Sequence, residues 1–184
     1  KLAELATYHL QIRPGTNVAI LNMLCHYIIT DNLVDEGFIK NHTEKYKEFK
    51  SHVESLNMDE LSELTRVDKE LVKKAAFAYA TAEKAMEFHG LGVTEHFQGS
   101  KTVMLLSNLA MMTGNIGKNG VGLNPLRGQN NVQGAADMGV QPHQGAGYMD
   151  INKPEIQQYY ADKYGVEKMP EREGYKIPQM LDAA

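Results

Sequence analysis

The chain has 184 residues, of which 42% are hydrophobic and 23% are charged, values typical of a soluble globular protein that can bury a modest core. Its formal net charge of −4 excludes a sequence-independent binder of nucleic acid or of acidic membranes, because such a protein needs a basic surface. No apolar run approaches the ~20 residues that span a bilayer, and no signal-peptide pattern opens the chain, so we expect a cytoplasmic protein. The single cysteine, Cys25, excludes an internal disulfide and a metal cage built from cysteines of this chain.

Helical patterns dominate the first half of the chain. The apolar stretch HLQI (9–12) predicts a short strand that ends at a Pro-Gly turn. Thr16 or Asn17 then caps a helix whose apolar residues recur at spacings of three and four, namely Ala19, Ile20, Met23, Leu24, Ile28 and Leu33. Short helices with one polar face are expected at 35–42, 45–56 and 58–65, and a longer helix is expected at 68–83 with Asp68 as its N-cap.

A strand, a glycine loop and a helix are expected next. The stretch KAMEFHGLG (84–92) predicts a strand that feeds a tight loop, and a helix begins at Ser100. This order indicates a helix-rich α/β fold. Nine of the 16 glycines lie between Gly114 and Gly147, where we expect neither helix nor strand. Helices are expected again at 153–165 and 178–184, on either side of a linker punctuated by proline and glycine.

The glycine loop that follows the predicted strand is a candidate ligand contact. Glu95 stands where the dinucleotide fingerprint needs its third glycine, and no Gly-Lys-Ser/Thr string provides a P-loop. Gly90 and Gly92 nevertheless allow the backbone to approach a ligand closely, and amides at the start of the following helix favour an anion. The alternative is a loop that only turns the chain.

The first turn, RPGTN (13–17), also leads directly into a helix, as the glycine loop does. Its Thr16 hydroxyl and Asn17 amide either recognise a nucleoside or simply cap the helix. Cys25 is expected to be a small buried hydrophobic residue. His89, His96 and His143 flank the glycine loops, where each is either an ordinary hydrogen-bonded histidine or part of a proton relay.

Arg127 is the only lysine or arginine between Asn119 and Asn152, and it lies among glycines and neutral amides in NPLRGQNNVQGAADMG. A guanidinium matches a carboxylate in two parallel hydrogen bonds, so such an arginine is suited to holding a small planar anion. The neighbouring amides suit the polar edges of a pterin or guanine, and they are Asn124, Gln129, Asn130, Asn131 and Gln133. The alternative is a loop that satisfies its own backbone around a surface arginine. Asp137 either orients Arg127 or binds an amine.

Two segments carry a family resemblance. QIRPGTNVAILNMLCHYIITDNLVDEGFIKNHTE (11–44) and the stretch from GLGVTEHFQGSKT to NPLRGQNNVQGAADMG (90–139) resemble the catalytic (alpha) subunit of molybdenum- or tungsten-dependent formate dehydrogenases, within the molybdopterin oxidoreductase superfamily. The resemblance extends from residue 1 to about residue 180. The RGQNN string favours the formate dehydrogenase branch over the nitrate reductase and dimethyl sulfoxide reductase branches.

The resemblance implies part of a Rossmann-like three-layer domain with few strands. Residues 1–129 would form the later part of an α/β domain that binds molybdopterin guanine dinucleotide, and residues 130–184 the start of the adjoining cofactor-binding domain. The implied reaction is oxidation of formate to CO2 through a bis-molybdopterin guanine dinucleotide centre containing molybdenum or tungsten. The resemblance further implies that the electrons pass to a 4Fe-4S cluster bound by residues outside this chain. An electron-transfer iron-sulfur subunit is the implied partner. A location in the periplasm is implied if a twin-arginine signal precedes the chain.

The resemblance also implies roles for individual residues. Arg127 would orient the formate carboxylate, and Gly128 and Gln129 would lie close to the pterin. Two further segments would wrap the cofactor: Gly15, Thr16 and Asn17 in the first turn, and Gly90, Leu91, Gly92, Val93 and Thr94 in the glycine loop. Glu95 departs from the glutamine familiar in the family, which puts its cofactor contact in doubt.

The residues that would ligate the metal and the iron-sulfur cluster are expected before Lys1. We therefore expect an internal fragment that is inactive on its own. Two alternatives remain open: another molybdopterin oxidoreductase that acts on a different small oxyanion, and a module that binds the pterin cofactor without redox chemistry.

Overall fold

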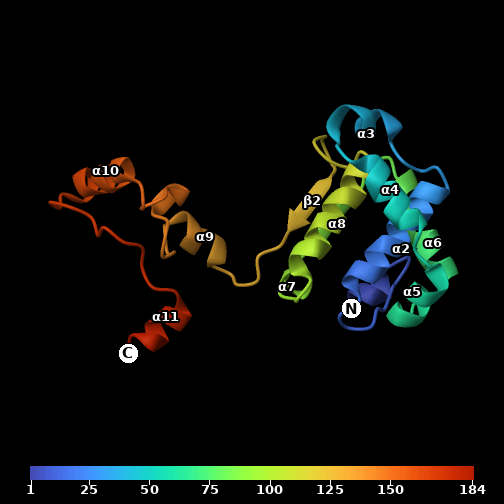
Figure 1. Cartoon of the computed structure of the whole chain (residues 1–184), viewed down its shortest axis with the longest axis horizontal. Coiled ribbons are helices and arrows are strands. Elements are labelled where there is room, and N and C mark those ends of the chain that lie inside the picture. Colours follow the sequence, from blue (N-terminus) through green and yellow to red (C-terminus); the bar gives the residue numbers. More distant parts are fainter. The chain divides into compact units, whose positions relative to one another are not determined.

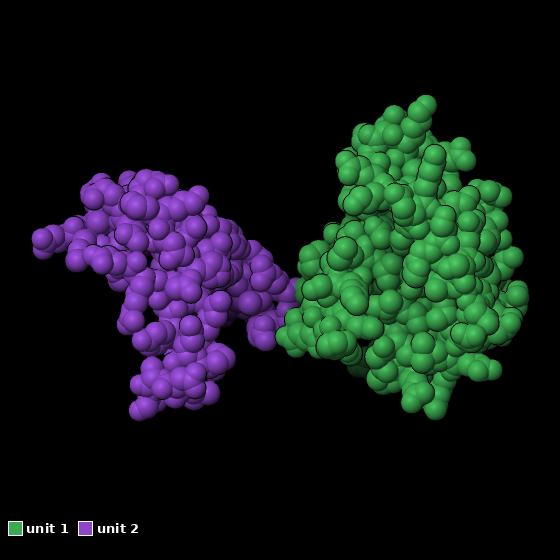
Figure 2. All heavy atoms as spheres, in the orientation of Figure 1, with its two compact units in different colours: residues 1–126 green, residues 127–184 purple.

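The computed structural model describes residues 1–184 and divides the chain into two compact units, residues 1–126 and residues 127–184 (Figure 2). The first unit holds most of the helices and both strands (Figure 1). Its elements are α1 (Leu2–Leu5), α2 (Asn17–Thr30), α3 (Glu36–His42), α4 (Tyr46–Glu54), α5 (Met58–Thr65), α6 (Lys69–Thr81), β1 (Met86–His89), α7 (Leu91–Thr94), α8 (Gly99–Met112) and β2 (Gly122–Pro125). The second contains α9 (Val132–Asp137), the 3-10 turn η1 (Ala146–Tyr148), α10 (Pro154–Tyr164) and α11 (Ile177–Asp182).

Helix α2 is the centre of the first unit, because α4, α5, α6 and α8 all pack against it (Figure 1). Its Met23, Cys25 and Ile28 side chains have no exposed surface. Val53 of α4 and Val72 of α6 are equally buried. A helix that contacts neighbours on most sides carries apolar residues around most of its circumference, which is what the sequence of α2 shows.

Side chains of the sequence set where several helices begin. The Asp35 carboxylate accepts a hydrogen bond from the Phe38 amide at 2.8 Å and caps α3. Asn57 accepts from the Asp59 amide at 3.0 Å and caps α5. Asp68 accepts from the Leu71 amide at 3.0 Å, which confirms the predicted N-cap of α6. These bonds satisfy amides that have no partner within their own helix.

The two strands pair in parallel, with Met86 opposite Gly122 and His89 opposite Pro125. Parallel strands need a crossover between them, and here α7 and α8 supply it. The strand predicted within 84–92 is therefore confirmed as β1, and the helix expected from Ser100 is confirmed as α8. The helix-rich α/β class is confirmed as well.

Three sequence expectations differ from the structure. HLQI (9–12) is not a strand, because no neighbouring segment offers it ladder hydrogen bonds; Leu10 and Ile12 only pack against the core. The glycine-rich region does contain regular structure, namely β2, α9 and η1. Thr16 occupies the N-cap position of α2, but its hydroxyl donates to the Arg13 carbonyl oxygen at 2.6 Å and closes the turn without bonding to the helix.

Cys25 is a buried structural residue, as expected. It has no exposed surface, and burial raises the pKa of its thiol to about 12. Because the thiolate is the reactive form, iodoacetamide is expected to leave Cys25 unmodified in the folded chain at pH 8 and to alkylate it fully in denaturant. Mass spectrometry measures both outcomes, and rapid alkylation of the folded chain would contradict this packing.

None of the helices combines the length and hydrophobicity needed to traverse a lipid bilayer.

Candidate functional site at the carboxyl edge of the sheet

The carboxyl ends of β1 and β2 lie at the same edge of the small sheet, because the strands are parallel and in register. His89 ends β1 and is followed by Gly90, and the Leu126 amide after β2 donates to the His89 carbonyl oxygen at 2.6 Å. Ligands of open parallel α/β sheets bind at this edge. The glycine loop therefore begins at the edge of the sheet where a ligand is expected to bind.

The glycine loop forms the single turn α7. The amides of Val93 and Thr94 both donate to the Gly90 carbonyl oxygen, at 3.0 and 3.2 Å. A Cβ atom built at Gly92 meets no atom within 4 Å, and one at Gly90 comes no closer than 3.7 Å to the Leu126 carbonyl oxygen. The packing of the protein therefore does not require glycine at positions 90 and 92. The missing side chains leave open space beside the loop.

The first turn and the glycine loop lie together, although 75 residues separate them. The Asn17 side-chain amide donates to the Gly92 carbonyl oxygen at 3.5 Å. A cavity of about 250 Å³ opens here, lined by Gly15, Asn17, His96, Phe97, Gln98 and Thr102. Gly15 adopts a φ of +86°, and a Cβ at this position would project into open space. The structure thus brings the first turn beside the glycine loop, and the first turn lines this cavity together with residues that follow the loop.

The turn between α7 and α8 is closely packed at Gly99. A Cβ built there would overlap the Thr94 carbonyl oxygen and lie 2.9 Å from the Thr94 carbonyl carbon. Alanine at position 99 must therefore displace the backbone of the glycine loop.

We expect Gly99→Ala to lower the free energy of unfolding by about 1–3 kcal/mol, the usual cost of forcing extra atoms into a packed site. Gly92→Ala is the matched control, since it adds the same methyl group in the same loop without a clash, and it should stay within about 0.5 kcal/mol of the wild type. Urea denaturation measures both values. Equal values for the two variants would show that the Gly99 contact is not tight.

Arg127, Gly128 and Gln129 begin the second unit, and all three are exposed. The Arg127 guanidinium makes no hydrogen bond or ion pair with the protein. Its charge nevertheless reaches Asp137, whose pKa is lowered first by the hydrogen bond from Tyr148, then by that from Gln133, and further by Arg127. The N–H donors of the Arg127 guanidinium are therefore free to bind a ligand.

A polar cluster near Arg127 is only partly predictable from the sequence. The Tyr148 hydroxyl donates to Asp137 Oδ1 at 2.6 Å, and the Gln133 amide donates to the same oxygen at 2.9 Å. Asp137 and Gln133 are one helical turn apart on α9, a spacing that the sequence shows. Tyr148 has no local signal, because it reaches the cluster through η1 with a positive φ of 63°.

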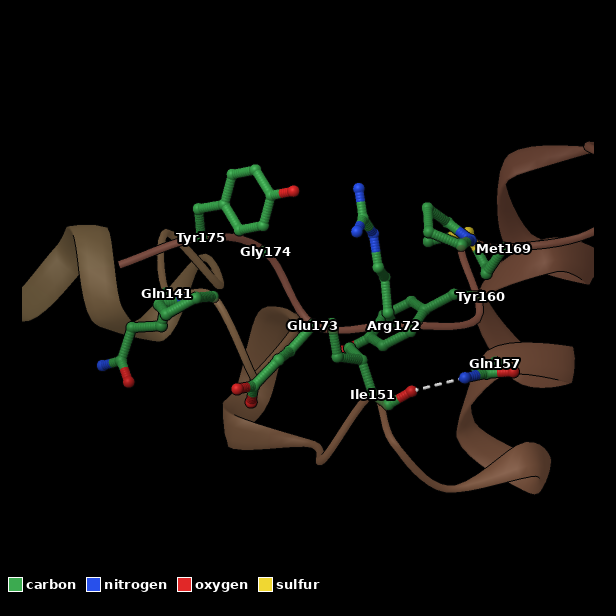
Figure 3. A pocket seen from close by; sticks show the side chains of 11 residues that line it. Gln141, Ile151, Gln157, Tyr160, Met169, Arg172, Glu173, Gly174 and Tyr175 are labelled. Carbon is green, nitrogen blue, oxygen red and sulfur yellow. Dashed lines mark hydrogen bonds between the residues drawn. The ribbon is translucent and has the colours of Figure 1, made fainter. Parts of the chain in front are cut away.

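The second unit also contains a cavity of about 380 Å³ that the sequence does not indicate (Figure 3). Tyr160 lines it and is held by a hydrogen bond from its hydroxyl to the Ala146 carbonyl oxygen, at 2.5 Å. The Arg172 guanidinium lies 5.1 Å from the centre of the Tyr175 ring at the rim. None of the predicted site residues lines this cavity.

No three or more histidine, cysteine, aspartate or glutamate side chains are grouped so that they could hold a metal ion. The polar side chains at the cavity beside the first turn are instead the amides of Asn17 and Gln98, the hydroxyl of Thr102 and the imidazole of His96. Such donors suit an uncharged polar ring system better than a bare cation.

A comparison with protein families decides the affiliation of the chain. The family described as molybdopterin oxidoreductase matches residues 3–180. The chain belongs to the molybdopterin oxidoreductase family. Formate dehydrogenase H of Escherichia coli is 40% identical to it over 178 residues, which are 97% of this chain and 25% of that protein. The F420-dependent formate dehydrogenase 1 subunit alpha of Methanococcus maripaludis is 44% identical over 99% of this chain and 27% of its own length.

Two further proteins are more distantly similar to the chain. The assimilatory nitrate reductase catalytic subunit of Bacillus subtilis is 33% identical over 97% of this chain and 25% of its own length. The structure of acetylene hydratase from Pelobacter acetylenicus superposes with a TM-score of 0.63 at 25% identity, over 65% of this chain and 16% of that one. The chain thus spans about a quarter of the length of the two formate dehydrogenases and the nitrate reductase.

Proposed function

We propose that this chain is part of the catalytic subunit of a formate dehydrogenase and that Arg127 positions the formate carboxylate. Four relatives named as formate dehydrogenases are 40–44% identical to the chain, two named as putative formate dehydrogenases are 35–37% identical, and the nitrate reductase relative is 33% identical. The observation that carries the role of Arg127 is its isolation: it is the only cation between Asn119 and Asn152, and no acid or carbonyl occupies its fork.

The polar side chains at the cavity beside the first turn support the cofactor implied by the family. A ring system with polar edges needs donors and acceptors without net charge, and Asn17, Gln98 and Thr102 supply them. The residues that would hold it are Gly15, Thr16 and Asn17 in the first turn and Gly90 to Thr94 in the glycine loop. Gly128 and Gln129 would contribute from the segment around Arg127.

The chemistry that the bis-molybdopterin guanine dinucleotide group supplies when bound, with molybdenum or tungsten, is acceptance of the two electrons that leave formate as CO2 and a proton are released. Onward transfer to a 4Fe-4S cluster and an electron-transfer subunit belongs to the same proposal. Arg127 would bind formate through two parallel hydrogen bonds and fix the direction of its C–H bond. A fixed guanidinium also stabilises the carboxylate electrostatically.

Substrate choice tests the proposal. The parent enzyme, meaning the longer polypeptide that contains this chain, is purified with its cofactor and mixed with an artificial electron carrier. We expect the oxidised carrier to be reduced when formate is added, and we expect no oxidation of the reduced carrier by nitrate. Oxidation by nitrate without any reaction with formate would favour the nitrate reductase branch. Bound pterin without either reaction would favour a binding module.

A further inference from the structure

The 3-10 turn η1 of the second unit is held on two sides. On one side, the Tyr160 hydroxyl of α10 donates to the Ala146 carbonyl oxygen at 2.5 Å, and a Cβ atom built at Gly145 would lie 2.5 Å from the Tyr160 ring. On the other side, a Cβ atom built at Gly139, which follows α9, would overlap the Ala146 amide nitrogen. The turn η1 is therefore packed between the end of α9 and α10.

Tyr148 ends this turn in a strained backbone conformation. Its φ is +63°, which lies in the left-handed region. A residue with a Cβ atom rarely adopts this conformation, and for a bulky side chain it is an outlier. Strained residues persist only where the surrounding contacts hold them, and they gather at functional sites. Tyr148 is therefore a candidate functional residue, although the sequence does not indicate it.

Tyr148 forms a closed triangle of hydrogen bonds with two side chains of α9. Its hydroxyl donates to Asp137 Oδ1 at 2.6 Å, and the Gln133 amide donates to both that oxygen and the Tyr148 hydroxyl oxygen, each at 2.9 Å. Hydrogen bonds to a carboxylate are stronger than those between neutral groups. All three side chains are exposed, so the packing of a core does not impose their contact. Gln133, Asp137 and Tyr148 are named the Tyr148 clasp here, because they attach η1 to α9.

The helix that the Tyr148 clasp holds is continuous with the segment around Arg127. Helix α9 begins at Val132, and the Val132 amide donates to the Gln129 carbonyl oxygen at 3.4 Å. The Ala135 amide, one turn later, donates to the Asn131 carbonyl oxygen at 2.8 Å. The position of α9 therefore sets the path of the backbone that leads to it from Arg127.

Arg127 also lies within electrostatic reach of the Tyr148 clasp, because the hydrogen bond from Tyr148, that from Gln133 and then the charge of Arg127 lower the pKa of Asp137. We propose that the clasp is a set of positioning residues, which fixes α9, restrains the segment 127–131 and so holds the Arg127 guanidinium in place for formate. A group that is held before its ligand arrives loses less conformational entropy on binding. The effect on formate rests on the proposed function, whereas the restraint on the segment does not.

The restraint is tested on the 184-residue chain without cofactor or formate. Tyr148→Phe removes only the hydroxyl that joins the clasp. Nitrogen-15 relaxation measures order parameters for the amides of residues 128–131, which we expect to be about 0.85 in the wild type and below about 0.6 in this variant. Tyr159→Phe is the matched control, because it removes an exposed hydroxyl of the same unit that makes no hydrogen bond, and it should give wild-type values. Order parameters that are equal in the wild type and Tyr148→Phe, or that fall equally in both variants, would overturn the restraint.

A double-mutant cycle in the parent enzyme tests whether the clasp acts through Arg127. We expect Tyr148→Phe to lower kcat/KM for formate by roughly tenfold, the scale of one hydrogen bond to a charged group. In the Arg127→Lys background, where the planar fork is already lost, the same substitution should change kcat/KM by less than about twofold. No loss in the wild-type background, or tenfold losses in both backgrounds, would overturn the positioning role. Should Arg127→Lys alone leave kcat/KM unchanged, the proposed function of Arg127 fails, whereas the order parameters still decide the restraint.

Discussion

Replacing Arg127 by lysine in the parent enzyme is expected to lower kcat/KM for formate by about a hundredfold or more. Lysine keeps the positive charge but loses the planar fork, so it cannot make two parallel hydrogen bonds to a carboxylate. The exposed guanidinium has no partner in the protein whose loss would unfold the chain. Steady-state kinetics with formate as the varied substrate measure the effect.

Arg172→Lys is the matched control for this experiment. It makes the same chemical change in the same unit. Arg172 stacks on Tyr175 and lines the second-unit cavity, which contains none of the predicted site residues. We expect kcat/KM for formate to change by less than about threefold in this variant, as for surface substitutions away from a site. Equal losses in both variants would point to a general effect of arginine replacement and would remove Arg127 from substrate binding.

Glu87→Gln is expected to stabilise the first unit at pH 8 by up to about 3 kcal/mol and to leave its stability nearly unchanged at pH 4.5. Burial raises the pKa of Glu87 from 4.5 to about 7, so the folded state holds a proton that the unfolded state has released. The free energy of unfolding therefore falls as the pH rises from 4.5 through 7. Glutamine, which cannot ionise, escapes this loss.

Urea denaturation of both chains at several pH values measures the difference. Glu83→Gln is the control, because Glu83 is exposed three residues before β1 and its substitution should give no pH-dependent difference. A stability difference between wild type and Glu87→Gln that stays constant from pH 4.5 to pH 8 would contradict the burial of an ionisable Glu87.

The longer helices of the first unit are predictable because each carries its own signals. The apolar spacing within α2 and the Asp68 cap of α6 are local features that act before any tertiary contact forms. Strand β2 is not predictable, since GLNP has no alternation and no β-branched residue and becomes a strand only by pairing with β1. The prediction for the HLQI stretch is wrong for the opposite reason: its pattern suits a strand, but the fold offers it no partner.

The candidate site is predictable in its parts and not in its assembly. Glycines and amides at 13–17 and 90–94 mark the two loops, whereas the bond between Asn17 and Gly92 depends on the packing of α2 beside α8. The division of the structure after Leu126 falls three residues before the boundary expected from the sequence, and the assignment of the two parts to separate cofactor-binding domains stays a prediction. The sequence indicates Glu87 only as part of a strand, because nothing local distinguishes a buried carboxyl from an exposed one.

A crystal structure of the parent enzyme with its cofactor and bound formate tests the central claim most directly. The measurement is the pair of distances from the Arg127 guanidinium nitrogens to the two formate oxygens. We predict that both are about 2.7–2.9 Å, the lengths of charge-assisted hydrogen bonds, and that the first turn and the glycine loop contact the cofactor. An Arg127 side chain that extends into solvent while formate is held by other residues would contradict the account.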